Sequence, residues 1–284
     1  MGDAAVLVVN GAAFEEGLLD VIEGAEEDGV PVFEAIDGVA TIEFGEEDSH
    51  AHEEGEEHED EDEHAHEEGE EHDDDEEKHD DEEGEEHDDD EDEHAHEEEG
   101  DAHAHDGADP HFFTDPARMA VAAEGIADFL IENVNGIDAE AVRANADDYI
   151  GELNALDEEL DGIFAGLSDD QRVLITNHEV FGYFADRYDF EVVGAVIPSG
   201  STSDGASGQA LAELAEAIEH EGVPAIFGDT SASSELIETL ADEVGEIEVV
   251  ELFSESLGDA DSGGGTYTDM VRTNADRIAS ALGS

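Results

Sequence analysis

The sequence lacks cysteine and has a single lysine, Lys78, among its 284 residues. Without cysteine the chain has no disulfide, no thiolate metal ligand and no cysteine to carry a lipid. It also lacks any run of about eighteen apolar residues, the length that a membrane-spanning helix needs. Its beginning, Met1 to Val6, has neither the basic region nor the apolar region of a signal peptide.

Positive charge is scarce, because seven Lys and Arg residues face 87 Asp and Glu residues and the formal net charge is −80. Such a chain repels itself in dilute salt, where the Debye length is about 10 Å, and tolerates concentrated salt, where that length falls to about 3 Å. We therefore interpret the protein as that of a halophile. The absence of a basic patch argues against nucleic acid as a partner.

One acidic segment, residues 46–109, holds twelve of the fifteen histidines. Its only apolar residues are alanines, so we expect it to be disordered without a ligand. Acid alone would suffice for a solvated spacer, which is the alternative interpretation, and the recurring His-Ala-His triplets favour metal binding instead. The histidines concerned are His50, His52, His58, His64, His66, His72, His79, His87, His94, His96, His103 and His105.

Outside this segment, apolar runs alternate with amphipathic stretches. Before it we predict strands at 6–10 and 32–35 and a helix over 14–25. After it we predict helices over 116–132, 138–167, 180–188, 209–221, 233–244 and 267–281, and strands at 172–176, 191–197, 223–228 and 247–252. This alternation predicts parallel sheets covered on both faces. The helix from 138 is long enough, at roughly 40 Å, to join two lobes.

The predicted fold is therefore α/β, with two parallel-sheet lobes joined by one long helix and interrupted by a disordered insert. We assign residues 1–45 and 110–137 to an incomplete N-terminal lobe and residues 46–109 to the insert. The linking helix takes residues 138–168, and the C-terminal lobe takes residues 169–284. The helix over 116–132 has a clear start, with Asp115 as cap and Pro116 at the first position.

Two histidines stand outside the insert on opposite sides of the long helix. His111 lies in an Asp-Pro-His motif, and His178 follows the strand at 172–176, where ligands of parallel sheets bind. Imidazole is the commonest metal ligand, so the pair predicts an ion held between the lobes. Each histidine suits a helix cap or a polar core position equally well, and the residues alone leave both interpretations open.

The segments Asp109–Pro116 and Thr176–Tyr188 resemble the zinc- and manganese-type substrate-binding proteins of ABC transporters. That family carries the motifs Asp-Pro-His-x-Trp-x-Asp-Pro and Thr-x-His-x-x-Phe-x-Tyr-Phe, and Phe113 stands here in place of the Trp. The long helix, Pro198-Ser-Gly-Ser, Tyr267-Thr-Asp-Met and the Asn-Gly pair that begins at Asn10 are also similar. The resemblance covers essentially everything outside the insert.

The resemblance implies that His111 and His178 are metal ligands, one from each lobe, and that the insert is the histidine-rich loop of zinc-type members. It implies a carboxylate ligand from the second lobe, for which Asp229 is the candidate, with a helix N-cap as its other interpretation. Glu179 is a candidate to orient His178, although a solvated acid is the commoner case in a chain this acidic, and we assign no metal role to His220. The family's first ligand histidine lies upstream of the Asn-Gly region, so we expect this chain to be an N-terminally truncated member.

The expected function is that of an extracytoplasmic receptor, secreted or lipid-anchored at the outer face of the cell membrane in the full-length protein. It would capture Zn²⁺ and deliver it to an ABC permease with its ATPase. The histidines favour zinc over manganese, which prefers oxygen ligands. A Mn²⁺ or Fe²⁺ receptor of the same fold is one alternative, and a surface metal-buffering or adhesion protein that uses the insert is another. No nucleophile or phosphate-binding motif is present, so we expect no enzyme.

Overall fold

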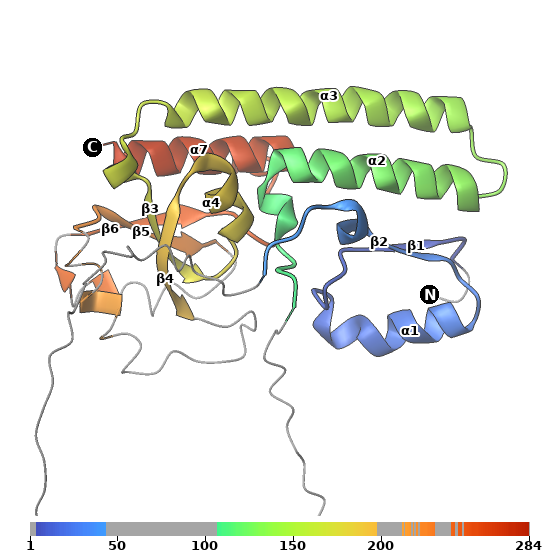
Figure 1. Ribbon diagram of the computed structural model, residues 1–284, viewed down its shortest axis with the longest axis horizontal. Helices are drawn as coiled ribbons and strands as arrows, with labels where there is room; N and C mark the ends of the chain where they lie inside the picture. The colour runs from blue at the N-terminus through green and yellow to red at the C-terminus, as the bar shows by residue number, and fades with distance from the viewer. Residues whose placement is uncertain are drawn as a thin grey trace, which may run out of the picture. The chain divides into compact units, whose positions relative to one another are not determined.

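The computed structural model of the chain describes residues 4–43, 107–197, 222–230 and 247–283, together with single positions between 212 and 245. The twelve histidines of the insert lie outside the described residues. In the described part of the chain, no helix is both long enough and apolar enough to cross a membrane. Figure 1 shows the arrangement of the elements.

The N-terminal part is a small α/β unit. Strands β1 (Leu7–Val9) and β2 (Val32–Glu34) pair in parallel, and η1 (Glu16–Leu18), α1 (Leu19–Glu27) and η2 (Ala35–Gly38) complete it. The helix predicted from residue 14 begins its α-helical turns only at Leu19. The reason is that Glu16, inside the predicted range, has a φ angle of 29°, which a right-handed α-helix cannot contain, and residues 16–18 form the separate turn η1.

The chain leaves this unit and returns to it at one place. Glu43 and Ala108 form an isolated antiparallel bridge, and the Asp109 amide donates to the Ile42 carbonyl at 2.9 Å. Residues 44–106 are therefore inserted between two neighbouring backbone segments. His111 follows three residues after the bridge.

Two antiparallel helices follow, α2 (Pro116–Asn133) and α3 (Ala139–Phe164), as Figure 1 shows. The predicted start of α2 is confirmed: the Asp115 carboxylate accepts from the amides of Ala117 and Arg118, and Pro116 occupies the first turn. The long helix is also confirmed, and α3 packs along both α2 and α7 (Tyr267–Leu282). Its buried side chains all lie in its C-terminal half, at Leu153, Leu156, Leu160 and Phe164.

Among the described residues of the C-terminal part, four strands form an all-parallel sheet in the order β4-β3-β5-β6. Its strands are β3 (Val173–His178), β4 (Glu191–Ile197), β5 (Ala225–Asp229) and β6 (Glu248–Leu252), and α4 (Gly182–Tyr188) follows β3. All four strands were predicted, with bounds that differ by at most two residues. The helices predicted over 209–221 and 233–244 are described in part, and their described positions from 212 to 220 and from 240 to 244 are helical.

The sheet is buried on both faces, as a parallel sheet requires. On one face Leu174, Phe227 and Leu252 pack among side chains of α3, α4 and α7. On the other face Ile175 and Ile226 pack against Leu214, Ile218 and Leu240. The strand order reverses direction between the adjacent strands β3 and β5, so the crevice beyond their carboxyl ends is the place where such sheets bind ligands.

Candidate metal centre

His111 is the most deeply buried of the candidate ligands whose side chains the structure describes. It precedes η3 (Phe112–Thr114), a single turn that leads into α2, and its exposed fraction is 1%. The rings of Phe14 and Phe113 meet the imidazole edge-on, with centroids 5.9 Å away in both cases. Phe113, which stands in place of the motif's Trp, therefore provides an aromatic ring in contact with His111, and the ring of His111 lies among apolar side chains.

The carboxylate of Asp109 fixes the His111 ring. Its Oδ1 accepts from the His111 backbone amide at 2.8 Å and lies 2.7 Å from Nδ1. Because an ionised carboxylate only accepts, the proton of a neutral imidazole belongs on Nδ1. The lone pair then lies on Nε2, and carboxylates commonly orient metal-binding histidines in this way.

Glu255 faces the other ring nitrogen. Its Oε1 lies 3.5 Å from His111 Nε2, and it follows β6 by three residues, beyond the carboxyl end of the strand. The sequence analysis missed this residue. Glu255 lies beyond the carboxyl end of a parallel strand, which is the same feature that identified His178 as a candidate. The chain has 87 acidic residues, however, so this one could be identified only once the structure placed the end of β6 beside His111.

The loop that bears Glu255 is held by a buried asparagine. Asn274 on α7 is 5% exposed, and its side chain accepts from the Phe253 amide at 2.9 Å and donates to the Phe253 carbonyl at 2.6 Å. The Arg277 guanidinium lies over the Phe253 ring and donates to the Glu251 carbonyl. The backbone two residues before Glu255 is therefore fixed to α7.

The Asn-Gly pair supports His111 from the N-terminal side. Asn10 Nδ2 donates to the Pro110 carbonyl at 2.9 Å. Gly11 has φ of 91°, and a Cβ there would lie 2.6 Å from Glu34 Oε2, so only glycine fits. The Asn-Gly pair, noted in the sequence only for its resemblance, therefore positions the peptide directly before His111.

Opposing effects set the pKa of His111. Burial lowers the pKa, whereas the hydrogen bonds and negative charges of Asp109 and Glu255 raise it, and their sum places the pKa above the usual value of 6.5. A cation at Nε2 would meet the same carboxylates that favour the protonated ring. The site is thus electrostatically suited to positive charge.

His178 and Asp229 end the adjacent strands β3 and β5. Thr176 pairs with Phe227, so two residues further along, His178 and Asp229 reach the same edge of the sheet, at the switch point. His178 pairs through its backbone with Ile197 of β4, and its side chain lies outside the described ones.

The remaining sequence assignments can be placed only in part. Asp229 is half-buried, and the helix that it was expected to cap starts outside the described residues. Glu179 is half-buried beside His178, and His220 is exposed on its helix. Among described side chains, no group of three or more His, Asp or Glu is arranged to hold a metal ion. The ligand set of His111, His178 and Asp229 therefore stays a prediction, to which the geometry adds Glu255.

Comparison with known proteins gives consistent matches. The family model described as "ZnuA: Zinc-uptake complex component A periplasmic" matches residues 1–281. The chain is similar to the zinc-binding protein TroA of Treponema pallidum, with 34% identity over 179 residues, or 61% of this chain and 57% of that protein. It is similar to the manganese-binding lipoprotein MntA of Halalkalibacterium halodurans, with 28% identity over 62% of this chain and 58% of the relative. The chain thus spans less than two thirds of the length of these relatives.

Solved structures share the fold. The structure of TroA from Treponema pallidum matches 99% of this chain and 82% of its own, with a TM-score of 0.68 and 24% identity. The structure of a manganese-bound periplasmic metal-binding protein from Candidatus Liberibacter asiaticus covers the same shares, with a TM-score of 0.69 and 16% identity. These likenesses confirm the predicted fold class, in which two α/β lobes are joined by a long helix. The domain boundaries stay predictions.

Proposed function

Because the chain belongs to the family of the periplasmic zinc-uptake component A, we propose that it is an extracytoplasmic receptor for Zn²⁺. In this proposal it captures the ion at the outer face of the cell membrane and delivers it to the permease of an ABC transporter, whose ATPase drives uptake. The protein performs no covalent chemistry, in keeping with a family whose members are uptake components.

The observation that carries the proposal is the setting of His111. The ring is buried, its Nδ1 lies 2.7 Å from Asp109, and its Nε2 lies 3.5 Å from Glu255, which comes from the other end of the chain. A histidine needed only to fill a polar core position would not require a second carboxylate at Nε2. Two segments so distant in sequence meet at one nitrogen, which suits an ion held between two parts of the fold.

The proposed ligands are His111 and His178, with a carboxylate from Glu255 or Asp229. Two imidazoles and one or two carboxylates form a set that zinc accepts readily. The insert, with its twelve histidines, is proposed as an accessory that raises the local concentration of zinc without forming the tight site.

Manganese is the second candidate cargo, and one observation favours it. Glu255 places a carboxylate oxygen beside His111, and oxygen ligands suit Mn²⁺ better than Zn²⁺. The relatives divide in the same way, since TroA and AdcA are named for zinc and MntA for manganese. An Fe²⁺ receptor would use the same site.

A metal titration of a chain that lacks residues 46–106 tests the proposal. The deletion spares Ala108 and Asp109, because the first pairs with Glu43 and the second fixes His111. Zn²⁺ and Mn²⁺ are titrated separately and in competition, in about 1 M salt so that the net charge is screened. His111→Ala in the same background is the control.

We expect one tight site in the deleted chain, zinc preferred over manganese, and loss of that site in His111→Ala. A preference for manganese would replace the cargo while keeping the receptor. Metal binding that disappears entirely with residues 46–106 would support the metal-buffering alternative and refute the receptor. Binding that survives His111→Ala unchanged would refute the site.

A further inference from the structure

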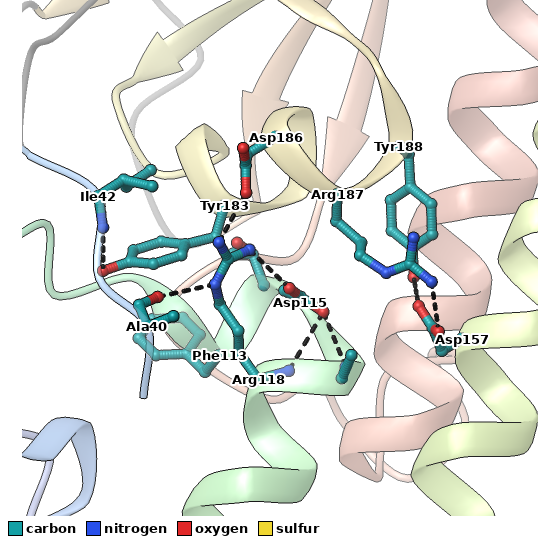
Figure 2. Close-up of polar contacts among 12 residues, drawn as sticks. Ala40, Ile42, Phe113, Asp115, Arg118, Asp157, Tyr183, Asp186, Arg187 and Tyr188 are labelled. Carbon is teal, nitrogen blue, oxygen red and sulfur yellow. Dashed lines mark hydrogen bonds and ion pairs between the residues drawn. The ribbon is translucent and has the colours of Figure 1, made fainter. Parts of the chain in front are cut away.

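Tyr183 holds both backbone segments that lead into and out of the insert. Its side chain is fully buried at the start of α4. Its hydroxyl donates to the Asp109 carbonyl at 2.6 Å and accepts from the Ile42 amide at 3.4 Å. Figure 2 shows the ring of Tyr183 reaching from α4 to Ile42. Burial raises the pKa of Tyr183 to about 12, so the hydroxyl keeps its proton and donates at every physiological pH.

The contacts of Tyr183 continue to the imidazole of His111. The residue whose carbonyl it binds, Asp109, is also the residue whose carboxylate fixes Nδ1 at 2.7 Å. The amide of Asp109 donates to the Ile42 carbonyl at 2.9 Å. The peptide of Asp109 is therefore held on both sides, and little freedom remains for the carboxylate that sets the ring of His111.

Arg118 packs against the ring of Tyr183, and the residue before Tyr183 lies close to Asp109. The Arg118 guanidinium lies 4.8 Å from the centroid of its ring, and Figure 2 shows that guanidinium between Asp115 of the α2 N-terminus and Asp186 of α4. Gly182 lets α4 approach closely, because a Cβ there would lie 2.9 Å from Asp109 Oδ2. The start of α4 thus rests directly against the carboxylate of Asp109.

Helix α4 also belongs to the segment that carries the second candidate histidine. His178 ends β3, and α4 begins four residues later at Gly182. A continuous chain of contacts therefore runs from the segment that follows His178, through Tyr183 and Asp109, to the ring of His111.

We propose that Tyr183 is a positioning residue of the metal site: its hydroxyl fixes Asp109, and Asp109 fixes the ring of His111 for the incoming ion. The inference rests on the proposed function. It assigns to the second motif a task beyond supplying His178, namely the alignment of the histidine contributed by the first motif.

Tyr188 provides a matched control on the same helix. It is buried, with an exposed fraction of 2%, and its hydroxyl donates to Asp157 of α3 at 3.0 Å. Figure 2 shows Tyr188 and Asp157 on the side of α4 away from Ile42. Tyr188→Phe and Tyr183→Phe each remove one buried hydroxyl that bonds to an oxygen acceptor, but only the second lies in the path to His111.

The experiment is a competition titration of the full chain with Zn²⁺ against a chelator, with His111→Ala defining the signal of the site. Thermal unfolding without metal is measured for every variant. We expect Tyr183→Phe to weaken tight zinc binding about tenfold, the lower range for loss of an outer partner of a ligand, and Tyr188→Phe to leave it unchanged. Asp109→Asn should weaken binding, and the double variant Asp109→Asn with Tyr183→Phe should lose no more than Asp109→Asn alone, because the two act in series.

Equal zinc affinities for folded Tyr183→Phe and Tyr188→Phe would overturn the inference, as would losses that simply multiply in the double variant. If Tyr183→Phe does not fold, Gly182→Ala decides, since it keeps the hydroxyl and pushes α4 against Asp109. Unchanged zinc affinity in folded Gly182→Ala would then overturn the inference, and weakened affinity would support it. A wild-type chain without a site that His111→Ala removes would instead refute the proposed function.

Discussion

Replacing Arg118 by methionine should destabilise the fold far more than replacing any exposed arginine. Its guanidinium bonds to Asp115 Oδ2 at 2.8 Å, to the Ala40 carbonyl at 3.0 Å and to Asp186 at 2.6 Å. Asp115 is 1% exposed, whereas the side chain of Asp186 is 52% exposed. The cost therefore arises mainly at Asp115, whose buried carboxylate would lose its only described cationic partner.

The magnitude follows from this burial. Removing one partner of a buried pair costs about 3 to 5 kcal/mol, and the Asp115 carboxylate retains its cap bonds to two backbone amides. The side chain of Arg118 is also partly exposed, at 17%. We therefore expect Arg118→Met to lower the free energy of unfolding by about 2 to 4 kcal/mol.

Arg143→Met is the matched control. Arg143 pairs with Asp128, and the two side chains are 43% and 57% exposed, so their pair should contribute less than about 1 kcal/mol. Both variants remove one positive charge and keep an unbranched apolar side chain. Any change caused by the overall charge therefore cancels between them.

Urea unfolding in about 1 M salt measures both variants. The pH dependence adds a second check. Burial raises the pKa of Asp115, and the bonds from Arg118 and the cap amides offset this only in part, so the folded pKa stays above 3.8. The protonated carboxyl thus favours folding below that pH, and this contribution is lost as the pH rises through the folded pKa. The loss of unfolding free energy caused by Arg118→Met should therefore become smaller in acid. If that loss at neutral pH is no larger than the loss caused by Arg143→Met, the reasoning is refuted.

Three further predictions concern the site and the core. Asn274→Ala should lower the free energy of unfolding by about 1 to 3 kcal/mol, because the backbone N–H and C=O of the buried Phe253 both lose their partner. It should also weaken zinc binding. A free energy of unfolding equal to that of the wild type would contradict this prediction. Zinc binding should weaken as the pH falls through the raised pKa of His111, because the proton competes for Nε2. In the metal-free protein the stabilisation from protonated His111 is present below pH 6.5 and is lost as the pH rises through the folded pKa; pH titrations with and without metal check both signs. Leu160→Ala, at a fully buried position, should cost about 2 to 5 kcal/mol, whereas Leu257→Ala, at a position 56% exposed, should unfold like the wild type.

The start of the N-terminal helix shows one limit of sequence reasoning. The pattern from Phe14 onward has helical periodicity, yet the α-helix begins at Leu19. Glu16 adopts a positive φ angle inside the predicted helix, and Ala12 and Ala13 do so just before it. Residues other than glycine rarely adopt such angles, so the local sequence gives no sign of them. The surrounding fold imposes this backbone conformation against the local preference.

Glu255 and Tyr183 show a second limit. Nothing adjacent to Glu255 distinguishes it from the other acids, and its place depends on how Asn274 holds the end of β6 against α7. Tyr183 bonds to a carbonyl 74 residues away. Contacts of this kind arise only when separate elements pack together.

The sequence by itself determined the features that depend on neighbouring residues: the capped start of α2 at Asp115, the long helix, the four strands of the C-terminal sheet and the motifs that hold His111 and His178. Hydrophobic periodicity and capping act over a few residues, so these can be identified before any folding is known. Only the tertiary structure decided which carboxylates flank the imidazole of His111 and which tyrosine aligns it. Glu255 and Tyr183 belong to segments that are distant from His111 in the chain, and the packing of α4, α7 and the sheet brings Glu255 to Nε2 of the ring and Tyr183 to the carbonyl of Asp109.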